Sequence, residues 1–328
     1  KGGVQPLKKV LITGASGFIG SHTVEEALNR GYSVRVFLRY NSAGYIGNLR
    51  FLEREKLKSI EIFWGDIRDY TSVLRATKGV DYVIHLAAQI SVPYSFQNPI
   101  DFAMNNVVGT TNILKASLES GVLKFVYTST SEIFGGSDEP LNENSLRVPK
   151  SPYAASKVGA DAMVKSFYYT YNLNTLIIRP FNTFGPRQSI RALIPWIIYQ
   201  ALNSDKVLLG NLNPKRDFTF VRDTVNGILL SLERETEGGD EINLGTGKSI
   251  SVLEVVGVVG KVLNKKLNVV QDPTLIRPER VEVHNLISDN RKAKEVLGWE
   301  PQWDFEDGVR ETVEYVRGLS IGGIGNWV

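Results

Sequence analysis

The chain has 328 residues, which allows one large domain or two modest ones, and its 42% hydrophobic content is ordinary for a globular protein. A net charge of +3 is too small to indicate a nucleic-acid partner, and the lack of cysteine excludes disulfides, thiolate catalysis and cysteine-ligated metal. With three scattered histidines and no apolar run of about 18 residues, we expect no metal site and no membrane partner. The lack of a signal-peptide core predicts a cytoplasmic protein.

The first element is a strand predicted over residues 8–13, which leads through a glycine-rich turn into a helix. Three glycines at spacings of three permit a tight turn, close approach of backbone N–H groups to a pyrophosphate, and close packing of helix on strand. Because a strand precedes the turn and a helix follows it, the pattern predicts nucleotide binding rather than a purely structural turn. The predicted contacts are Gly14, Ser16, Gly17, Phe18, Ile19 and Gly20.

The second strand, predicted over 34–38, ends without the acid that NAD-preferring sites use to hold the ribose 2′-hydroxyl. Leu38 takes that position and Arg39 follows, a combination better suited to a 2′-phosphate. We therefore expect NADP rather than NAD, with Arg39 as a cofactor contact. The alternative is that Arg39 is a solvated loop charge.

Two further strands are predicted over 60–64 and 82–87. The first leads into Asp66 and Ile67, where the carboxylate can accept from an adenine amino group, cap the next helix, or do both. The second ends in small residues, where a ligand can approach the backbone closely. The predicted contacts there are Leu86, Ala87 and Ala88. We interpret His85, inside the same apolar strand, as a core histidine rather than a catalytic one.

A helix predicted over 101–120 leads into a fifth strand over 124–129. Strands that alternate with helices in this way predict an α/β fold, a Rossmann-type doubly wound parallel sheet with right-handed crossovers. Ligands of such sheets bind beyond the carboxyl ends of the strands. We therefore expect one cleft to be lined by Gly14, Asp66, Ala87 and Thr130.

Beyond a sixth strand over 175–179 the pattern becomes less regular, and one more strand, over 240–244, is expected to rejoin the sheet. Helices are predicted near 193–202, 251–263, 290–297 and 307–316. We predict a dinucleotide-binding domain over 1–180, completed by the strand near 240–245. A smaller, discontinuous α/β domain over 181–328 would mainly bind substrate.

The chemistry is expected where the fifth strand meets a helix that begins near Tyr153. Tyr153 and Lys157 are four residues apart, so both side chains leave the same helix face. An ammonium beside a phenol lowers the pKa of the tyrosine, and Thr130 at the strand end can hydrogen-bond a substrate hydroxyl. Together these groups can remove a proton from an alcohol while hydride leaves its carbon. Glu132 adds a carboxylate, unless it is only a surface or helix-capping acid.

Five motifs in order resemble those of one family: residues 13–20, 65–66, 85–88, the Tyr153 and Lys157 pair, and 179–182. Over about residues 8–317 the chain resembles extended short-chain dehydrogenases/reductases that act on nucleotide sugars. Two branches compete, because 4-epimerases carry no acid at the place of Glu132, whereas 4,6-dehydratases carry a glutamate there. The Thr-Ser-Glu run at 130–132 is similar to that of GDP-mannose 4,6-dehydratases. It also resembles dehydratases that act on nucleotide-linked N-acetylglucosamine for legionaminic-acid-type sugars.

The resemblance implies that Tyr153 takes the O4 proton while C4 hydride passes to the nicotinamide, with Thr130 orienting O4 and Lys157 also holding the nicotinamide ribose. Glu132 would remove the C5 proton, water would leave across C5 and C6, and the hydride would return to C6. The cofactor would thus stay tightly bound and be recycled. In dTDP-glucose dehydratases an Asp precedes this Glu, and Ser131 replaces it here. Besides the 4-epimerase of UDP-glucose or UDP-N-acetylglucosamine type, a non-catalytic NADP-binding sensor is a third alternative.

The resemblance also implies a substrate, a GDP- or UDP-linked hexose or N-acetylhexosamine, whose diphosphate needs cations and amides. It further implies a homodimer, formed through the helices that contain Asp101 and Tyr153. The candidate substrate contacts are Gln89, Ser91, Tyr94, Asn182, Arg187, Arg191, Asn211, Arg216 and Arg277. Arg187 and Arg191 can equally be solvated.

Overall fold

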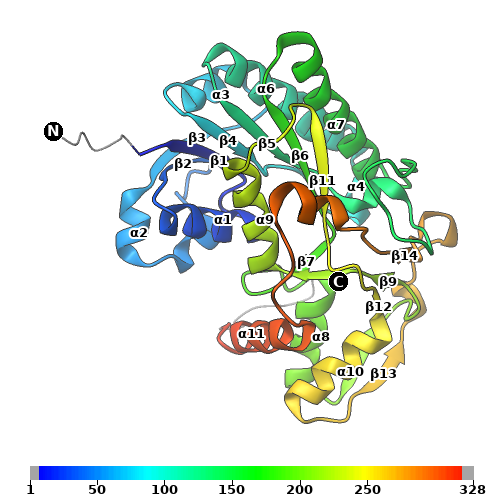
Figure 1. Cartoon of the computed structure of the whole chain (residues 1–328). Coiled ribbons are helices and arrows are strands. Elements are labelled where there is room, and N and C mark those ends of the chain that lie inside the picture. The colour runs from blue at the N-terminus through cyan, green and yellow to red at the C-terminus, as the bar shows by residue number, and fades with distance from the viewer. Residues whose placement is uncertain (1–6, 320–328) are drawn as a thin grey trace.

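Seven parallel strands form the central sheet of the computed structural model, which describes residues 7–319 (Figure 1). Their order is β11-β6-β5-β4-β1-β2-β3, and every neighbouring pair is parallel. The strands are β1 (Lys9–Thr13), β2 (Ser33–Arg39), β3 (Glu61–Gly65), β4 (Tyr82–His85), β5 (Lys124–Thr128), β6 (Thr175–Pro180) and β11 (Asp240–Leu244). The predicted Rossmann-type fold is confirmed.

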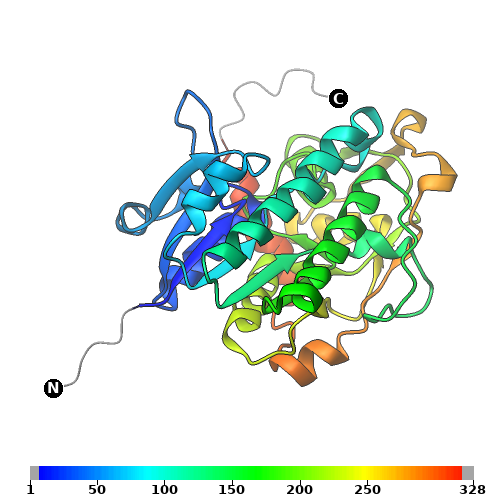
Figure 2. The same ribbon diagram turned by 90° about the horizontal axis from the view of Figure 1, so that it is seen from above.

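Helices cover both faces of this sheet because its strands are apolar on both sides. On β1, Val10 and Ile12 face one core and Leu11 faces the other. Figure 2, seen from above, shows α6 and α7 side by side across one face of the sheet. That face carries α3 (Tyr70–Thr77), α6 (Gly109–Glu119) and α7 (Pro152–Tyr171), and the other carries α1 (Phe18–Asn29) and α9 (Val221–Glu233).

The helix predicted over 101–120 is a run of three pieces: α5 (Pro99–Phe102), a π-helical turn η2 (Ala103–Val108) and α6. The wider turn directs Asn106 toward the segment that follows β4. The amide of Asn106 accepts from the backbone N–H of Gln89 (2.8 Å) and donates to the Ser156 hydroxyl of α7 (2.9 Å). A π turn at this place thus fixes the β4 exit to the helix that carries Tyr153.

The remaining elements form small sheets and helices below the central sheet in Figure 1. β7 (Asn182–Phe184) pairs with β10 (Phe218–Phe220), and β8 (Lys206–Leu209) pairs with β13 (Asn268–Gln271). β9 (Lys215–Arg216) lies between β12 (Ile250–Ser251) and β14 (Asn285–Leu286). The helices here are α8 (Leu193–Asn203), α10 (Val252–Leu263) and α11 (Phe305–Arg317).

β11 pairs with β6 and so returns the chain to the central sheet. The division into two domains near residue 180 stays a prediction, and its outermost parts, 1–6 and 320–328, lie outside the described residues. Among residues 7–319, no helix has the length and apolar character needed to cross a membrane.

The long helix α9 was not predicted from the sequence. Its Val, Thr and Gly residues are weak helix formers, and packing decides its structure instead. Gly227 shows this, because a Cβ there would lie 2.4 Å from a methyl group of Leu244 in β11. The prediction also omitted two short helices, α2 (Arg54–Ser59) and α4 (Val92–Gln97). The helix predicted over 290–297 ends in a π turn, η6 (Ala293–Leu297).

The remaining short elements are 3-10 turns: η1 (Gly47–Phe51), η3 (Ser131–Phe134), η4 (Pro273–Leu275) and η5 (Glu279–Val281).

Candidate active site

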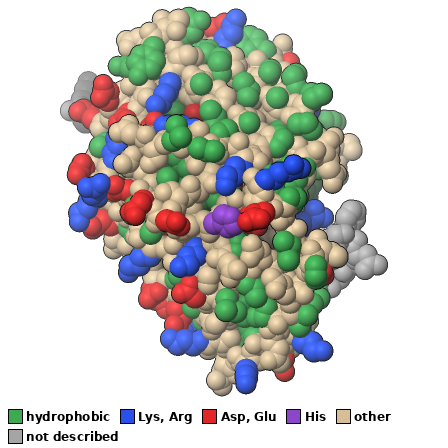
Figure 3. Space-filling model, turned by 90° about the vertical axis from the view of Figure 1, so that its right-hand side faces the viewer, with side chains coloured by type: hydrophobic (Ala, Val, Ile, Leu, Met, Phe, Trp, Pro, Cys, Tyr) green, Lys and Arg blue, Asp and Glu red, His purple; other side chains and the backbone are tan. Residues whose placement is uncertain are grey.

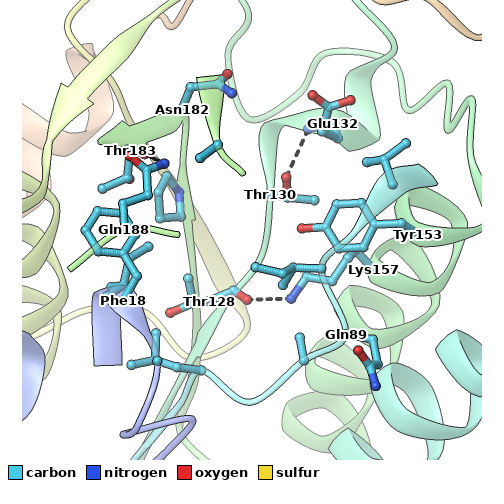
Figure 4. A pocket seen from close by; sticks show the side chains of 18 of the residues that line it. Phe18, Gln89, Thr128, Thr130, Glu132, Tyr153, Lys157, Asn182, Thr183 and Gln188 are labelled. Atoms are coloured by element: carbon cyan, nitrogen blue, oxygen red, sulfur yellow. Dashed lines mark hydrogen bonds between the residues drawn. The ribbon is translucent and has the colours of Figure 1, made fainter. Parts of the chain in front are cut away.

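A cavity of about 880 Å³ lies at the carboxyl ends of the central strands and is closed on one side by the small sheets (Figure 4). The β1–α1 turn and the exits of β3, β4 and β5 form one wall, and the segments around Asn211, Arg216 and Arg277 form the other. All the predicted cofactor and catalytic residues line this cavity. Of the predicted substrate contacts, those that line it are Gln89, Asn182, Asn211, Arg216 and Arg277.

Four predicted substrate contacts lie outside the cavity lining: Ser91, Tyr94, Arg187 and Arg191. Ser91 caps α4, where its hydroxyl accepts from the backbone N–H of Tyr94 (3.3 Å). The guanidinium of Arg187 pairs with Glu25 of α1 at 2.7 Å and so turns toward α1. Arg191 is exposed at the start of the segment before α8. The structure therefore does not bring these four side chains together with the other candidate residues.

The turn between β1 and α1 has the shape that a dinucleotide requires. Gly14 has a φ of +67°, and a Cβ there would lie 2.7 Å from the backbone nitrogen of Ala87. A Cβ on Gly20 would lie 2.0 Å from the carbonyl oxygen of Gly14. No side chain caps the first turn of α1, so its N–H groups and positive dipole end are available to an anion. The residues present thus fit a nicotinamide dinucleotide.

A hydrogen-bond chain behind this turn fixes the β4 exit. The hydroxyl oxygen of Thr13 accepts from the backbone N–H groups of Leu86 and Ala87 (both 3.1 Å), so its proton goes to Nδ1 of His85 (2.6 Å). Nε2 of His85 then carries the ring proton and donates to Thr110 of α6 (3.0 Å). Burial, with the charge of Lys157, lowers the pKa of His85 to about 3. His85 is a neutral core residue that supports the β4 exit behind the glycine turn.

Thr130, Tyr153 and Lys157 form the proposed proton-transfer group. The side chains of Tyr153 and Lys157 are buried at the centre of the cavity (Figure 4). Burial raises the pKa of Tyr153 to about 12, against which a hydrogen bond with Thr130 acts. Lys157 donates from Nζ to the carbonyl oxygen of Thr128 at 2.8 Å, and burial lowers its pKa to about 8. The expectation that the ammonium lowers the pKa of this phenol is therefore wrong here. Desolvation has the largest effect on the pKa of the phenol, and the ammonium of Lys157 is turned toward the carbonyl oxygen of Thr128.

Glu132 lies at the start of η3, the turn that directly follows the fifth strand. Its backbone N–H donates to the Thr130 hydroxyl (3.2 Å), which fixes the turn. Its carboxylate lines the cavity, with Oε1 at 4.0 Å from Nε of Arg216. The side chain is 19% exposed and so neither a surface acid nor a fully buried one. Glu132 and Tyr153 therefore face the same space.

Arg216 is positioned by contacts that the sequence did not reveal. It donates to the carbonyl oxygen of Val283 (2.6 Å), and burial lowers its pKa. The next residue, Asp217, is fully buried and accepts from three backbone N–H groups, those of Thr246 (2.8 Å), Gly247 (3.0 Å) and Ser288 (3.0 Å). This carboxylate thus ties β9 to two loops and holds Arg216 at the cavity. The sequence signal that could have pointed to Asp217 was its position, as a charged residue directly after an arginine predicted to bind phosphate.

The polar groups of Thr128, Ser129 and Gln188 were missed as lining groups, whereas Asn182 was predicted. The hydroxyls of Thr128 and Ser129 and the amide oxygens of Asn182 and Gln188 are buried, and none makes a hydrogen bond within residues 7–319. Buried polar atoms need partners, so these four fit a polar ligand. Figure 4 shows Asn182 and Gln188 across the cavity from Tyr153. Over the same residues, no three His, Asp or Glu side chains form a group that could hold a metal ion.

Comparison with known proteins identifies the family. The sequence profile "GDP-mannose 4,6 dehydratase" matches residues 11–312. The chain belongs to this family. The predicted resemblance to extended nucleotide-sugar dehydratases is confirmed.

Relatives within the family include both dehydratases and epimerases. Mouse dTDP-D-glucose 4,6-dehydratase is 31% identical over 317 residues, which cover 94% of this chain and 89% of the relative. UDP-glucose 4-epimerase of Mycolicibacterium smegmatis is 34% identical over 324 residues, 95% of this chain and 99% of the relative. The relatives therefore support an enzyme that modifies nucleotide sugars, without distinguishing dehydration from epimerisation.

Solved structures agree with this. DesIV, a dTDP-glucose 4,6-dehydratase from Streptomyces venezuelae with NAD and TYD bound, has a TM-score of 0.81 and 31% identity, covering 94% of this chain and 97% of its own. UDP-glucose 4-epimerase from Thermotoga maritima, with UDP-glucose, has a TM-score of 0.83 and 31% identity, with 94% and 98% covered. The NAD in DesIV gives no support to the predicted preference for NADP.

Proposed function

We propose that this chain is a nucleotide-sugar 4,6-dehydratase that makes a 4-keto-6-deoxy-hexose by loss of water across C5 and C6. The observation that carries the proposal is Glu132, a carboxylate in the same cavity as Tyr153 and Thr130. Epimerisation at C4 needs no base for C5, whereas dehydration does. A bound nicotinamide dinucleotide supplies the hydride acceptor for C4 and returns the hydride to C6.

The chain's own residues handle the protons. Tyr153 takes the proton from O4, with Thr130 orienting that oxygen. The resulting 4-ketone acidifies the C5 proton, which Glu132 removes and passes to the C6 hydroxyl, so that this group leaves as water. Because burial raises the pKa of Tyr153 to about 12, proton removal from O4 needs a nearby positive charge. We assign that charge to Lys157, one helical turn away, whose ammonium would have to turn from the carbonyl oxygen of Thr128 toward the phenol.

The proposed substrate is a GDP- or UDP-linked hexose or N-acetylhexosamine. Arg216 and Arg277 on the outer wall suit its diphosphate, since guanidinium groups bind phosphate oxygens bidentately. Gln89 suits the hexose, because Asn106 holds its backbone at the cavity edge. The amides of Asn182 and Asn211 line the space between these ends.

We further propose that NADP is preferred over NAD. A second cavity of about 590 Å³ lies at the end of β2 and shares Ser16 and Arg39 with the main cavity. Its other lining residues carry hydroxyl and amide groups, among them Asn41, Tyr45 and Asn48. The loop is packed onto the glycine turn, since the N–H of Asn48 donates to the carbonyl oxygen of Ser16 (2.9 Å). A polar recess with one arginine beside the ribose position suits a 2′-phosphate.

We also propose a homodimer formed by α4, α5, η2 and α7. These helices pack together and expose large apolar side chains. Figure 3 shows hydrophobic side chains gathered on the upper half of the face on which α4 and α7 lie in Figure 1. The exposed residues are Tyr94, Phe96, Ile100, Met104, Val108, Tyr169 and Tyr171.

The function is tested by incubating the enzyme and NADP or NAD with UDP- and GDP-linked hexoses and N-acetylhexosamines, and recording product mass. Loss of one water supports dehydration, an isomer of unchanged mass supports epimerisation, and the absence of turnover supports a cofactor-binding sensor. Glu132→Gln keeps the size and polarity of the side chain but cannot take the C5 proton. We expect this variant to lose dehydration and to keep cofactor binding. Dehydration at the wild-type rate in Glu132→Gln would disprove the assigned base.

A further inference from the structure

A buried ion pair lies directly behind Tyr153 and Lys157. Asp161 follows Lys157 by one turn on α7, and its Oδ2 accepts from Nη2 of Arg179 on β6 at 2.9 Å. Arg179 is fully buried and also donates to Glu241 (2.6 Å) and Asn243 (3.0 Å) of β11. This single guanidinium therefore joins the helix of the proton-transfer group to two strands of the central sheet.

The same guanidinium also contacts the turn that carries Glu132. Its Cζ lies 5.3 Å from the centre of the Phe134 ring in η3, two residues after Glu132. Arg147 lies over the same ring at 5.9 Å and pairs with Glu241 at 2.5 Å. Arg179 thus connects the helix of Tyr153 with the turn of Glu132, and these are the two residues proposed to take protons from the substrate.

We propose that the Asp161–Arg179 pair is a positioning element of the active centre, which keeps the ammonium of Lys157 charged and holds α7 against the turn that carries Glu132. The functional meaning rests on the roles proposed above for Tyr153, Lys157 and Glu132. The electrostatic part does not depend on whether the product is dehydrated or epimerised.

The electrostatic argument follows from which charges face Lys157. Burial lowers the pKa of Lys157 to about 8, the carboxylate of Asp161 opposes this, and Arg179 adds to it. Oδ1 of Asp161 is buried and makes no hydrogen bond within the described part of the chain, so only Arg179 offsets this carboxylate directly. Removal of the Asp161 charge therefore leaves Lys157 beside an arginine with a weaker counter-charge.

The other groups near Lys157 do not replace Asp161. Tyr127 on β5 lies under Nζ, with its ring centre at 4.6 Å, and His85 on β4 is neutral. Asp101 pairs with Arg68, and Lys115 pairs with Glu119. The titratable and charged groups on the elements that pack against α7 are Tyr94 (α4), Asp101 (α5), Lys115 and Glu119 (α6), Glu132 (η3) and Arg179 (β6).

The test is the titration of the Lys157 amine, followed by nitrogen NMR of protein with isotope-labelled lysine and assigned with Lys157→Arg. In Asp161→Asn we expect the pKa of Lys157 to fall by about one unit. The matched control is Glu241→Gln, which removes a carboxylate from the same Nη2 atom but leaves Asp161 beside Lys157. We expect that control to keep the wild-type titration. An equal shift in both variants, or no shift in Asp161→Asn, would overturn the proposal.

A second variant covers a failure of Asp161→Asn to fold. Asp161→Asn with Arg179→Met removes both buried charges and leaves no unpaired partner between them. Because Asp161 acts on Lys157 more strongly than Arg179 does, the pKa of Lys157 should still fall in this double variant. An unchanged or raised pKa would contradict the proposal. The titration needs no substrate, so its failure is distinct from a failure of the dehydratase assignment, which product mass tests.

Discussion

Tyr153 is the residue on which the proposed oxidation step depends most directly. Tyr153→Phe keeps the buried ring but removes the phenol oxygen that, as phenolate, accepts the O4 proton. We expect hydride transfer to fall by about a hundredfold or more, because a positioned acid–base group contributes about that much. The measurement is the appearance of reduced nicotinamide in a single turnover, with cofactor affinity recorded alongside.

Tyr127→Phe is the matched control for that variant. Tyr127 is an equally buried tyrosine that contacts Lys157 through its ring face, and its hydroxyl does not line the cavity. We expect its loss to change the rate of hydride transfer little. Comparable rates in the two variants would show that the Tyr153 hydroxyl is not the proton acceptor.

The sequence predicted which residues meet at the cavity better than it predicted how they are charged there. Spacing and strand ends were enough to bring Gly14, Asp66, Thr130 and Tyr153 to one cleft. The pKa values of Tyr153 and Lys157 depend first on burial and also on the charge of Asp161, both of which belong to the packed structure. Local spacing carries no information about that desolvation.

At the scale of single elements, the loop after β2 decides the proposed cofactor preference. Arg39→Ala removes the cation shared by the two cavities. We expect affinity for NADP to fall about tenfold or more while affinity for NAD changes little, since a hydrogen bond to a charged group contributes about 1.5–3 kcal/mol. Calorimetric titration with each dinucleotide measures both values.

Arg50→Ala is the control for the cofactor test. Arg50 contacts Tyr45 in the same loop region but does not line the second cavity. Its loss should leave the ratio of the two affinities close to that of the wild type. A wild-type protein that binds NAD more tightly than NADP would refute the preference.

The ion network around β11 makes a prediction about acid stability. Burial alone would raise the pKa of Glu241, but Arg179, Lys165 and Arg147 lower it to about 2. A carboxyl whose folded pKa lies below its unfolded value near 4.5 stabilises the fold above that value. This stabilisation is lost as the pH falls toward 2. Glu241→Gln should therefore lower the free energy of unfolding by about 3 kcal/mol at neutral pH, and by less in acid.

Urea unfolding at several pH values measures this effect. Glu314→Gln removes an exposed carboxylate that pairs with Arg317 on α11, and should change stability by less than about 1 kcal/mol. If the cost of Glu241→Gln were the same at neutral and acid pH, ionisation of Glu241 would not be its cause.

The elements themselves show where sequence patterns are sufficient. Continuous apolar runs predicted the strands of the central sheet within one or two residues, because both faces of those strands are buried. α9 was missed because its own residues favour a helix only weakly, and it is stabilised by contact with α1 and β11. The π turn at Ala103–Val108 also depends on distant partners, since Asn106 bonds to Ser156 of α7.

At the scale of the whole molecule, the exposed apolar side chains on α4, α5, η2 and α7 lead to a prediction about assembly. Ile100 is 77% exposed on α5, and Ile100→Glu would place a charge within the proposed dimer surface. We expect the wild type to sediment at twice the chain mass of 36.5 kDa and Ile100→Glu to sediment as a monomer. Leu253→Glu, an exposed position on α10 away from these helices in Figure 1, should remain dimeric. A wild type that stays monomeric at every concentration, or dissociation of both variants alike, would exclude this surface as the interface.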